Sequence, residues 1–92
     1  MKLSDDEVSA GLGELPGWER QGDQIVKEYK FPGFMDAIGF VGWVADAAEA
    51  ADHHPDIAIN WNKVTLDLST HSEGGLSAKD FRLAGEIDQL VG

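Results

Sequence analysis

The three histidines of this 92-residue chain all lie between residues 53 and 71. His53 and His54 are adjacent, and His71 follows 17 residues after His54. An imidazole can both donate and accept protons near neutral pH, because its unperturbed pKa is about 6.5. It is also a frequent ligand of zinc. The grouping therefore raises the question of whether the fold brings the three side chains to one place.

Two runs of alternating apolar and polar residues separate the histidines. This period of two predicts two half-buried strands that form a hairpin around Asn62-Lys63. In our predicted register, paired positions have numbers that sum to 125. All apolar side chains of the runs then share one buried face, with Trp61 beside Val64 in the core. The apolar members are Ile57, Ile59, Trp61, Val64, Leu66 and Leu68.

The same register predicts that the histidines converge. It places His54 directly opposite His71, with Cβ atoms about 5 Å apart on the polar face. His53 lies one residue earlier, at the corner between a helix and the strand. We expect Glu49 to face His53 from one helical turn before it. Pro55 lacks an amide hydrogen, which suits the first residue of a strand.

Capping, turn and periodicity patterns in the sequence predict the helices and strands that hold these residues. Ser4 and Glu7 form a capping-box pattern that starts a helix, which ends near Gly11 or Gly13. A hairpin turning at residues 21–23 follows, and apolar residues at helical spacing predict a helix from 34 to about 51. A last helix begins at Ser77. We assign Trp18 and Trp43 to packing of the hairpin and helix.

The predicted order is α-β-β-α-β-β-α in one domain spanning residues 1–92. This order indicates an α+β fold, with a four-stranded antiparallel sheet made of two hairpins and three helices packed on one face. A core of this size is modest, which favours pairing with a second copy.

Composition excludes several classes of function. Seventeen acidic residues against seven basic ones give a formal charge of −10, which opposes binding to nucleic acid or to anionic membranes. The chain has no cysteine, so disulfides and thiolate metal sites are excluded. The first ten residues, MKLSDDEVSA, do not resemble a signal peptide, and we expect a cytoplasmic protein.

The histidine group has three interpretations. The imidazoles could form only local hydrogen bonds, they could bind zinc, or they could act in metal-free acid–base catalysis. Adjacent histidines point apart and rarely bind one ion, which argues against zinc. Neither a cysteine nor a serine in an elbow motif is available as a nucleophile. Acidic residues near the group, which include Asp52 and Asp56, would favour protonated imidazole. The residues favour acid–base chemistry, for which no metal or cofactor is expected, and they leave the other two interpretations open.

The residues around the histidines also resemble a known family. The segments EAADHHP, NKVTLDLSTH and GLSAKD, with Trp61 six residues after Pro55, are similar to pterin-4a-carbinolamine dehydratase from about Glu49 to Asp80. The resemblance implies a metal-free enzyme that dehydrates 4a-hydroxytetrahydropterin to quinonoid dihydropterin. It also implies a role in recycling the pterin used by aromatic amino acid hydroxylases, and assembly into a dimer or tetramer.

The resemblance also implies roles for individual residues. His53 and His71 match the positions credited with proton transfer, and His54 matches the histidine that binds and orients the pterin. The supporting and substrate-bordering set is Glu49, Asp52, Ser69, Thr70 and Asp80. Asp80 also has a simpler explanation as a residue of the first turn of a helix. Ile57 and Lys79 depart from the family, in which an aromatic residue and an arginine are familiar there.

A function from a different class remains open at this point. Animal relatives also act as dimerisation partners of a transcription factor through a helical surface. An exposed apolar patch on the middle helix would favour such a non-enzymatic interaction module, but it would also serve self-association.

Overall fold

The structure is a computed structural model that describes residues 1–91. The predicted order of helices and strands is confirmed. A short 3₁₀ helix, η1, that the sequence did not predict precedes the last helix. In chain order the elements are α1 (Asp5–Leu12), β1 (Glu19–Gln21), β2 (Gln24–Lys30), α2 (Phe34–Ala51), β3 (Asp56–Asn60), β4 (Lys63–Leu68), η1 (His71–Glu73) and α3 (Ala78–Val91).

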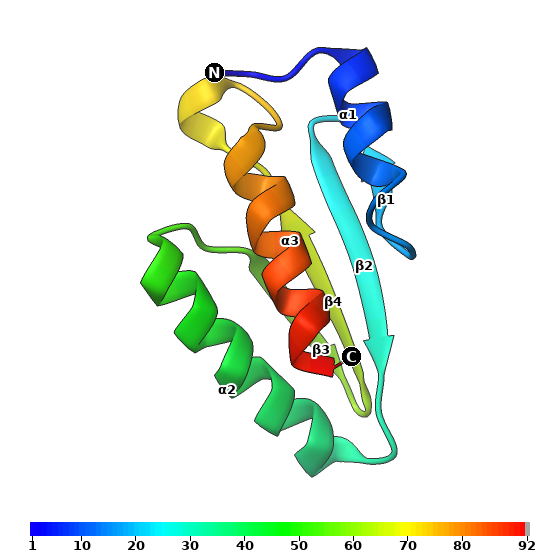
Figure 1. Ribbon diagram of the computed structural model, residues 1–92. Coiled ribbons are helices and arrows are strands. Elements are labelled where there is room, and N and C mark those ends of the chain that lie inside the picture. The colour runs from blue at the N-terminus through cyan, green and yellow to red at the C-terminus, as the bar shows by residue number, and fades with distance from the viewer. Residues whose placement is uncertain (92) are drawn as a thin grey trace.

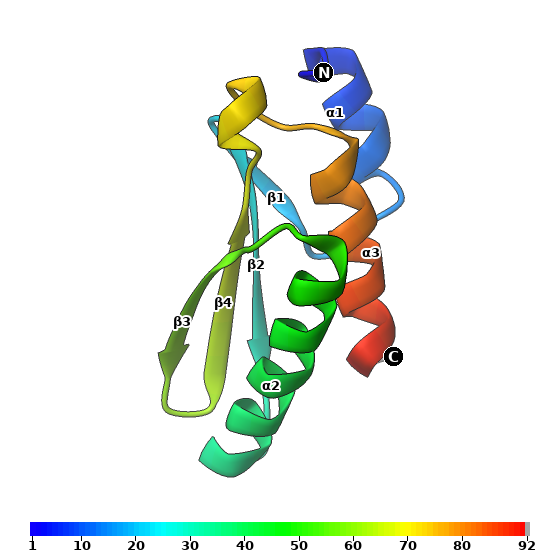
Figure 2. The ribbon, with the colours of Figure 1, turned by 90° about the vertical axis from the view of Figure 1, so that its left-hand side faces the viewer.

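The four strands form one antiparallel sheet in the order β1-β2-β4-β3. The two predicted hairpins are therefore joined through β2 and β4, and β3 is an edge strand. Figure 1 shows the helices in front of the sheet, and Figure 2 shows the sheet as one layer with the helices on one side. The expected single-faced α+β architecture is confirmed. Among residues 1–91, no helix combines the length and apolar character needed to span a bilayer.

Local chain signals set the ends of the helices. The Ser4 hydroxyl accepts the amide of Glu7, and the Glu7 carboxylate accepts the amide of Ser4, so the capping box at the start of α1 is formed. At the other end of the middle helix, Asp52 adopts a left-handed conformation with φ of 50°. Its amide donates to carbonyls of the last turn of α2, which ends the helix and redirects the chain toward the histidines.

The core lies between the sheet and the helices. Alternate residues of β2 and β4 point into it, as the period of two requires. They pack against one stripe of α2 and one of α3. The core side chains of these elements are Ile25, Tyr29, Ala37, Phe40, Val44, Val64, Leu66, Leu68, Leu83, Ala84 and Ile87.

A half-buried carboxylate, Asp88, connects α3 to the first hairpin. It accepts hydrogen bonds from the Trp18 indole, the Lys27 ammonium and the Tyr29 hydroxyl. Burial and the neighbouring Asp88 raise the pKa of Tyr29 well above its usual range. Trp18 is buried, as predicted. The three bonds tie α3 to the first hairpin.

The register of the second hairpin differs from the prediction by two residues. Ile57 pairs with Leu66 and Ile59 with Val64, so the numbers of paired residues sum to 123. The two-residue turn is Trp61-Asn62 and not Asn62-Lys63. A shift of two residues preserves which face each side chain occupies, so the apolar residues still share one side. The predicted direct pairing of His54 with His71 is therefore wrong, and His71 lies in η1 beyond the strand.

The turn itself explains the shift. Asn62 is buried, its side-chain amide donates to the carbonyl of Phe31, and the amide of Phe31 donates back to the carbonyl of Asn62. This reciprocal pair fixes the turn against the end of β2. Trp61 is forced to a φ of 55° and its side chain is 66% exposed. The prediction that Trp61 belongs to the core is therefore wrong. The assignment of Trp43 to packing is also wrong, because Trp43 is 59% exposed on α2.

Candidate functional site

The buried carboxylate of Asp80 is the centre of the site. Its side chain has no solvent exposure and lies in the first turn of α3. One oxygen accepts the Thr70 hydroxyl at 2.8 Å and the Ser77 amide at 3.0 Å. The other oxygen lies 2.6 Å from Nε2 of His53. A single carboxylate therefore ties the loop after α2 to the end of β4 and to the start of α3.

The hydrogen-bond directions around Asp80 follow from donor chemistry. An ionised carboxylate only accepts, so Thr70 and His53 both donate to it. The Thr70 proton is then committed to Asp80, and the Ser77 hydroxyl donates to Thr70 across 2.7 Å. The Ser77 oxygen in turn accepts the Lys79 amide. This network leaves Asp80 with a full set of partners and fixes the position of the His53 ring.

The bond from His53 to Asp80 selects a tautomer. Because Nε2 donates its proton to the carboxylate, the neutral ring carries its lone pair on Nδ1. The side chain of His53 retains 12% exposure, so the ring is held but not sealed from solvent. Nδ1 is thus the nitrogen that can exchange a proton with a bound molecule.

His54 has a different carboxylate partner. Its Nε2 donates to Glu49, which lies in the last turn of α2, and both side chains are exposed. The expectation that Glu49 faces His53 is therefore wrong. Glu49 pairs with His54, and Asp80 pairs with His53. The reason is the left-handed Asp52, which turns the chain so that the two adjacent imidazoles point to different neighbours. The Asp52 side chain itself is exposed.

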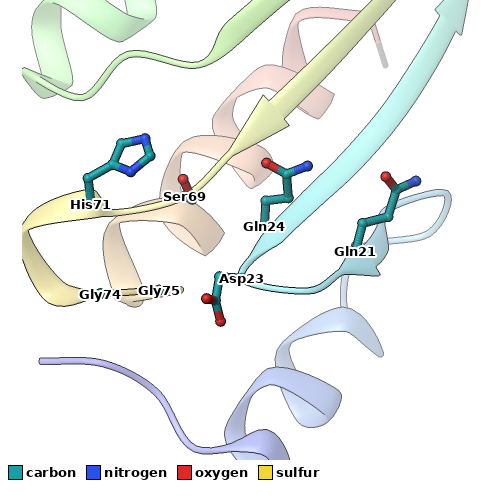
Figure 3. Close-up of a pocket in the computed structure, with 7 residues that line it drawn as sticks. All are labelled: Gln21, Asp23, Gln24, Ser69, His71, Gly74 and Gly75. Carbon is teal, nitrogen blue, oxygen red and sulfur yellow. The ribbon is translucent and has the colours of Figure 1, made fainter.

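His71 lies close in the chain to the Asp80 network but lines a separate hollow. It directly follows Thr70 and is exposed at the start of η1. Figure 3 shows Ser69 and His71 on one side of a cavity of about 300 Å³, with residues of the first hairpin on the other. His53 lines a second cavity of about 350 Å³ between α2 and α3. In Figures 1 and 2 the loop after α2 and η1 lie toward the same end of the sheet.

The outer face of the sheet near Ser69 carries a pair of acids. Asp56 and Asp67 are direct cross-strand partners. Partial burial raises the pKa of Asp67 above its usual value, and repulsion from Asp56 is the second, smaller cause. The surroundings of the hollow at Ser69 and His71 are therefore acidic, with Asp23 on its rim.

Within residues 1–91, no three histidine, aspartate or glutamate side chains are grouped so that they could share an ion. The chain has no cysteine to add to such a set. The imidazole nitrogens that have partners, Nε2 of His53 and of His54, face carboxylates.

Ser77 is a site residue that sequence reasoning did not place there. The capping motif that Ser77 forms with Asp80 predicts only a helix start. In the structure Ser77 is buried, and its amide and hydroxyl both belong to the network that holds His53. Because the resemblance names Asp80 as a site residue, the capping motif could have indicated that its partner Ser77 also lies at the site.

Comparisons with known proteins show which family this chain resembles. The family model described as pterin 4 alpha carbinolamine dehydratase matches residues 1–90. Relatives that carry the family's name include one from Roseiflexus castenholzii, 56% identical over 97% of this chain and 96% of its own length. Another, from Picosynechococcus, is 51% identical over 97% of each chain.

Two solved structures share the fold. A crystal structure of a transcriptional coactivator/pterin dehydratase from Brucella melitensis superposes with a TM-score of 0.96, at 33% identity and full coverage of both chains. A pterin dehydratase-like RuBisCO assembly factor of the alpha-carboxysome superposes with a TM-score of 0.71. It is 23% identical and covers 83% of this chain and 90% of that one, so this second likeness concerns the fold alone. With the family model matching nearly its whole length, this chain belongs to the pterin 4 alpha carbinolamine dehydratase family.

Proposed function

We propose that the protein dehydrates a 4a-hydroxytetrahydropterin to the quinonoid dihydropterin by histidine acid–base catalysis, and so helps to recycle a pterin cofactor. The pterin is the substrate, and no metal or cofactor takes part. We place the pterin ring between the loop of residues 52–54 and residues 69–71, which Asp80 links through its bonds to His53 and Thr70. The proposal rests on family membership and on one observation: Asp80 holds His53 and the residue before His71 through the same carboxylate.

The proposed step moves two protons. His53 accepts the proton of N5 on Nδ1, which is the nitrogen that its bond to Asp80 leaves with a lone pair. His71, which is exposed, donates a proton to the hydroxyl on C4a. The C4a–O bond breaks, water leaves, and the N5 electrons form the new double bond to C4a. His54, held by Glu49, orients the ring, and the backbone at Ser69 and Thr70 borders it.

Dehydration of a freshly generated carbinolamine, with and without a chelator, tests this proposal. We expect the protein to accelerate the loss of water to the same extent in both conditions, because protons and not a Lewis acid supply the catalysis. Absorbance of the quinonoid product gives the rate. A rate equal to that without protein would contradict the proposed function, and a rate lost on chelation would contradict the metal-free mechanism.

A second proposal concerns self-association through α2, and it is favoured by the apolar surface of that helix. Phe34, Met35 and Trp43 are exposed. Met35 and Trp43 border hollows that also involve Leu90 at the end of α3. A contiguous apolar surface of this kind marks an interaction site. A second copy of this chain is the expected occupant, in a dimer or tetramer.

Replacing Trp43 by glutamate should shift the assembly toward monomer. The change places a charge in the apolar surface, which costs far more when that surface is covered by another subunit than when it faces water. Sedimentation velocity measures the state. Ser9→Glu, on the exposed side of α1, adds the same charge and should leave the sedimentation coefficient unchanged. A monomeric wild type would contradict the proposal.

A further inference from the structure

The cavity beside His53 has an unusual electrostatic character for this chain. It is lined by Lys79 and Arg82 of α3 and by Glu86, with Ala50 and Ala51 of α2 opposite. Two of only seven basic residues in a chain of net charge −10 therefore face one hollow. Within residues 1–91, neither Lys79 nor Arg82 forms a salt bridge, whereas Arg20 and Lys27 both do.

The cavity adjoins the group proposed to carry the reaction. His53 is one of its lining residues, and the Nε2 of that ring is fixed by Asp80. Lys79 directly precedes Asp80 on α3, and its amide donates to Ser77 of the same network. A molecule bound in this cavity therefore lies close to His53 and to both cations.

The bonding within the pterin ring indicates which part of the substrate would enter this cavity. The side chain of a pterin is attached to C6, and C6 is bonded to N5. If His53 takes the N5 proton, the side chain lies on the His53 side of the ring and can extend into the cavity between α2 and α3. The volume, about 350 Å³, exceeds that of a short chain with a terminal anion.

We propose that the cavity lined by Lys79 and Arg82 binds an anionic group, phosphate or carboxylate, at the end of the pterin side chain. This inference rests on the proposed dehydratase function and names the substrate class that the site prefers. A guanidinium offers paired donors to such a group, and the lysine adds a point charge. Glu86, on the same cavity, opposes the anion and weakens the preference.

The test uses two carbinolamines with the same ring, one with a neutral hydroxyalkyl side chain at C6 and one with that chain phosphorylated. We expect the wild type to show a kcat/KM ratio that favours the phosphorylated substrate by about tenfold, as two screened charge contacts supply. The double variant Lys79→Gln/Arg82→Gln should bring the ratio close to one. Glu86→Gln should raise it above the wild-type value.

A matched control removes two positive charges elsewhere. Lys30 and Lys63 are cross-strand partners at the end of β2 and the start of β4, opposite the site. Lys30→Gln/Lys63→Gln changes the net charge equally, so it should keep the wild-type ratio if the effect is local. A ratio that falls as far in this control as in the cavity variant would overturn the inference in favour of long-range attraction.

The outcomes separate this inference from the function on which it rests. Turnover of both substrates with a wild-type ratio near one would overturn the anion pocket and leave the dehydratase proposal standing. Turnover of neither substrate would overturn both. Inorganic phosphate, added while His53 is observed by NMR, distinguishes the source of the anion. Saturable shifts combined with a ratio near one would assign the pocket to free phosphate and overturn a side-chain pocket.

Discussion

Replacing either His53 or His71 by alanine should lower turnover by about 10²–10⁴-fold, the usual contribution of a positioned proton-transfer group. His53→Ala removes the base that Asp80 orients, and His71→Ala removes the acid. Steady-state rates with a freshly generated carbinolamine measure the loss. Both variants should stay folded by circular dichroism, because His71 is exposed and His53 keeps some exposure.

Two controls make this result specific. Added imidazole should partly restore His71→Ala, since the hollow of about 300 Å³ at that side chain can admit the free ring. His53→Ala leaves one oxygen of the buried Asp80 without its donor, so its thermal stability should fall more than that of His71→Ala. Wild-type activity in both single variants would contradict the assignment of these histidines.

Changing Asp80 to asparagine should lower activity about 100-fold while preserving most of the packing. The amide oxygen can still accept from Ser77 and Thr70, but the amide nitrogen would then donate to Nε2 of His53. The His53 proton would move to Nδ1, and the ring would have no lone pair for the substrate. In a serine protease triad, the corresponding change of aspartate to asparagine gives the wrong histidine tautomer. It greatly lowers kcat although the geometry is intact. The loss should appear in kcat, with a solvent isotope effect that differs from the wild type.

Asp88→Asn is the matched control. Asp88 also lies on α3 and also accepts three hydrogen-bond donors, from Trp18, Lys27 and Tyr29. Its replacement should lower the free energy of unfolding by about 1–3 kcal/mol, through lost charge-assisted bonds, and leave kcat near the wild-type value. If the two variants lost kcat equally, Asp80 would act only through stability. Asp80→Ala should be the least stable of the three, because Thr70 and Ser77 would keep buried donors without an acceptor.

Asp80 also shows what a local sequence motif can predict and what it cannot. The capping pattern at Ser77 correctly located the start of α3 and placed Asp80 in its first turn. The pattern concerns residues three apart, so it contains no information about a histidine 27 residues earlier. The contact with His53 exists because β4 and the loop after α2 are both packed beneath that turn. The capping pattern and the family resemblance both indicated Asp80, but only the packed structure shows that its partner is His53.

The sequence by itself determined the elements, their order and the face of each strand. Capping residues, turn residues and the periods of 2 and 3.6 are local properties, and they were sufficient for the α+β architecture. The tertiary structure decided the register of the second hairpin. Alternation is unchanged by a slip of two residues, so only the contact of Asn62 with Phe31 selects one register over the other. That selection moved Trp61 to the surface and set His71 beyond the strand. The pairing of each imidazole with its carboxylate was decided in the same way, because the left-handed turn at Asp52 and the height of α3 over the sheet are products of packing.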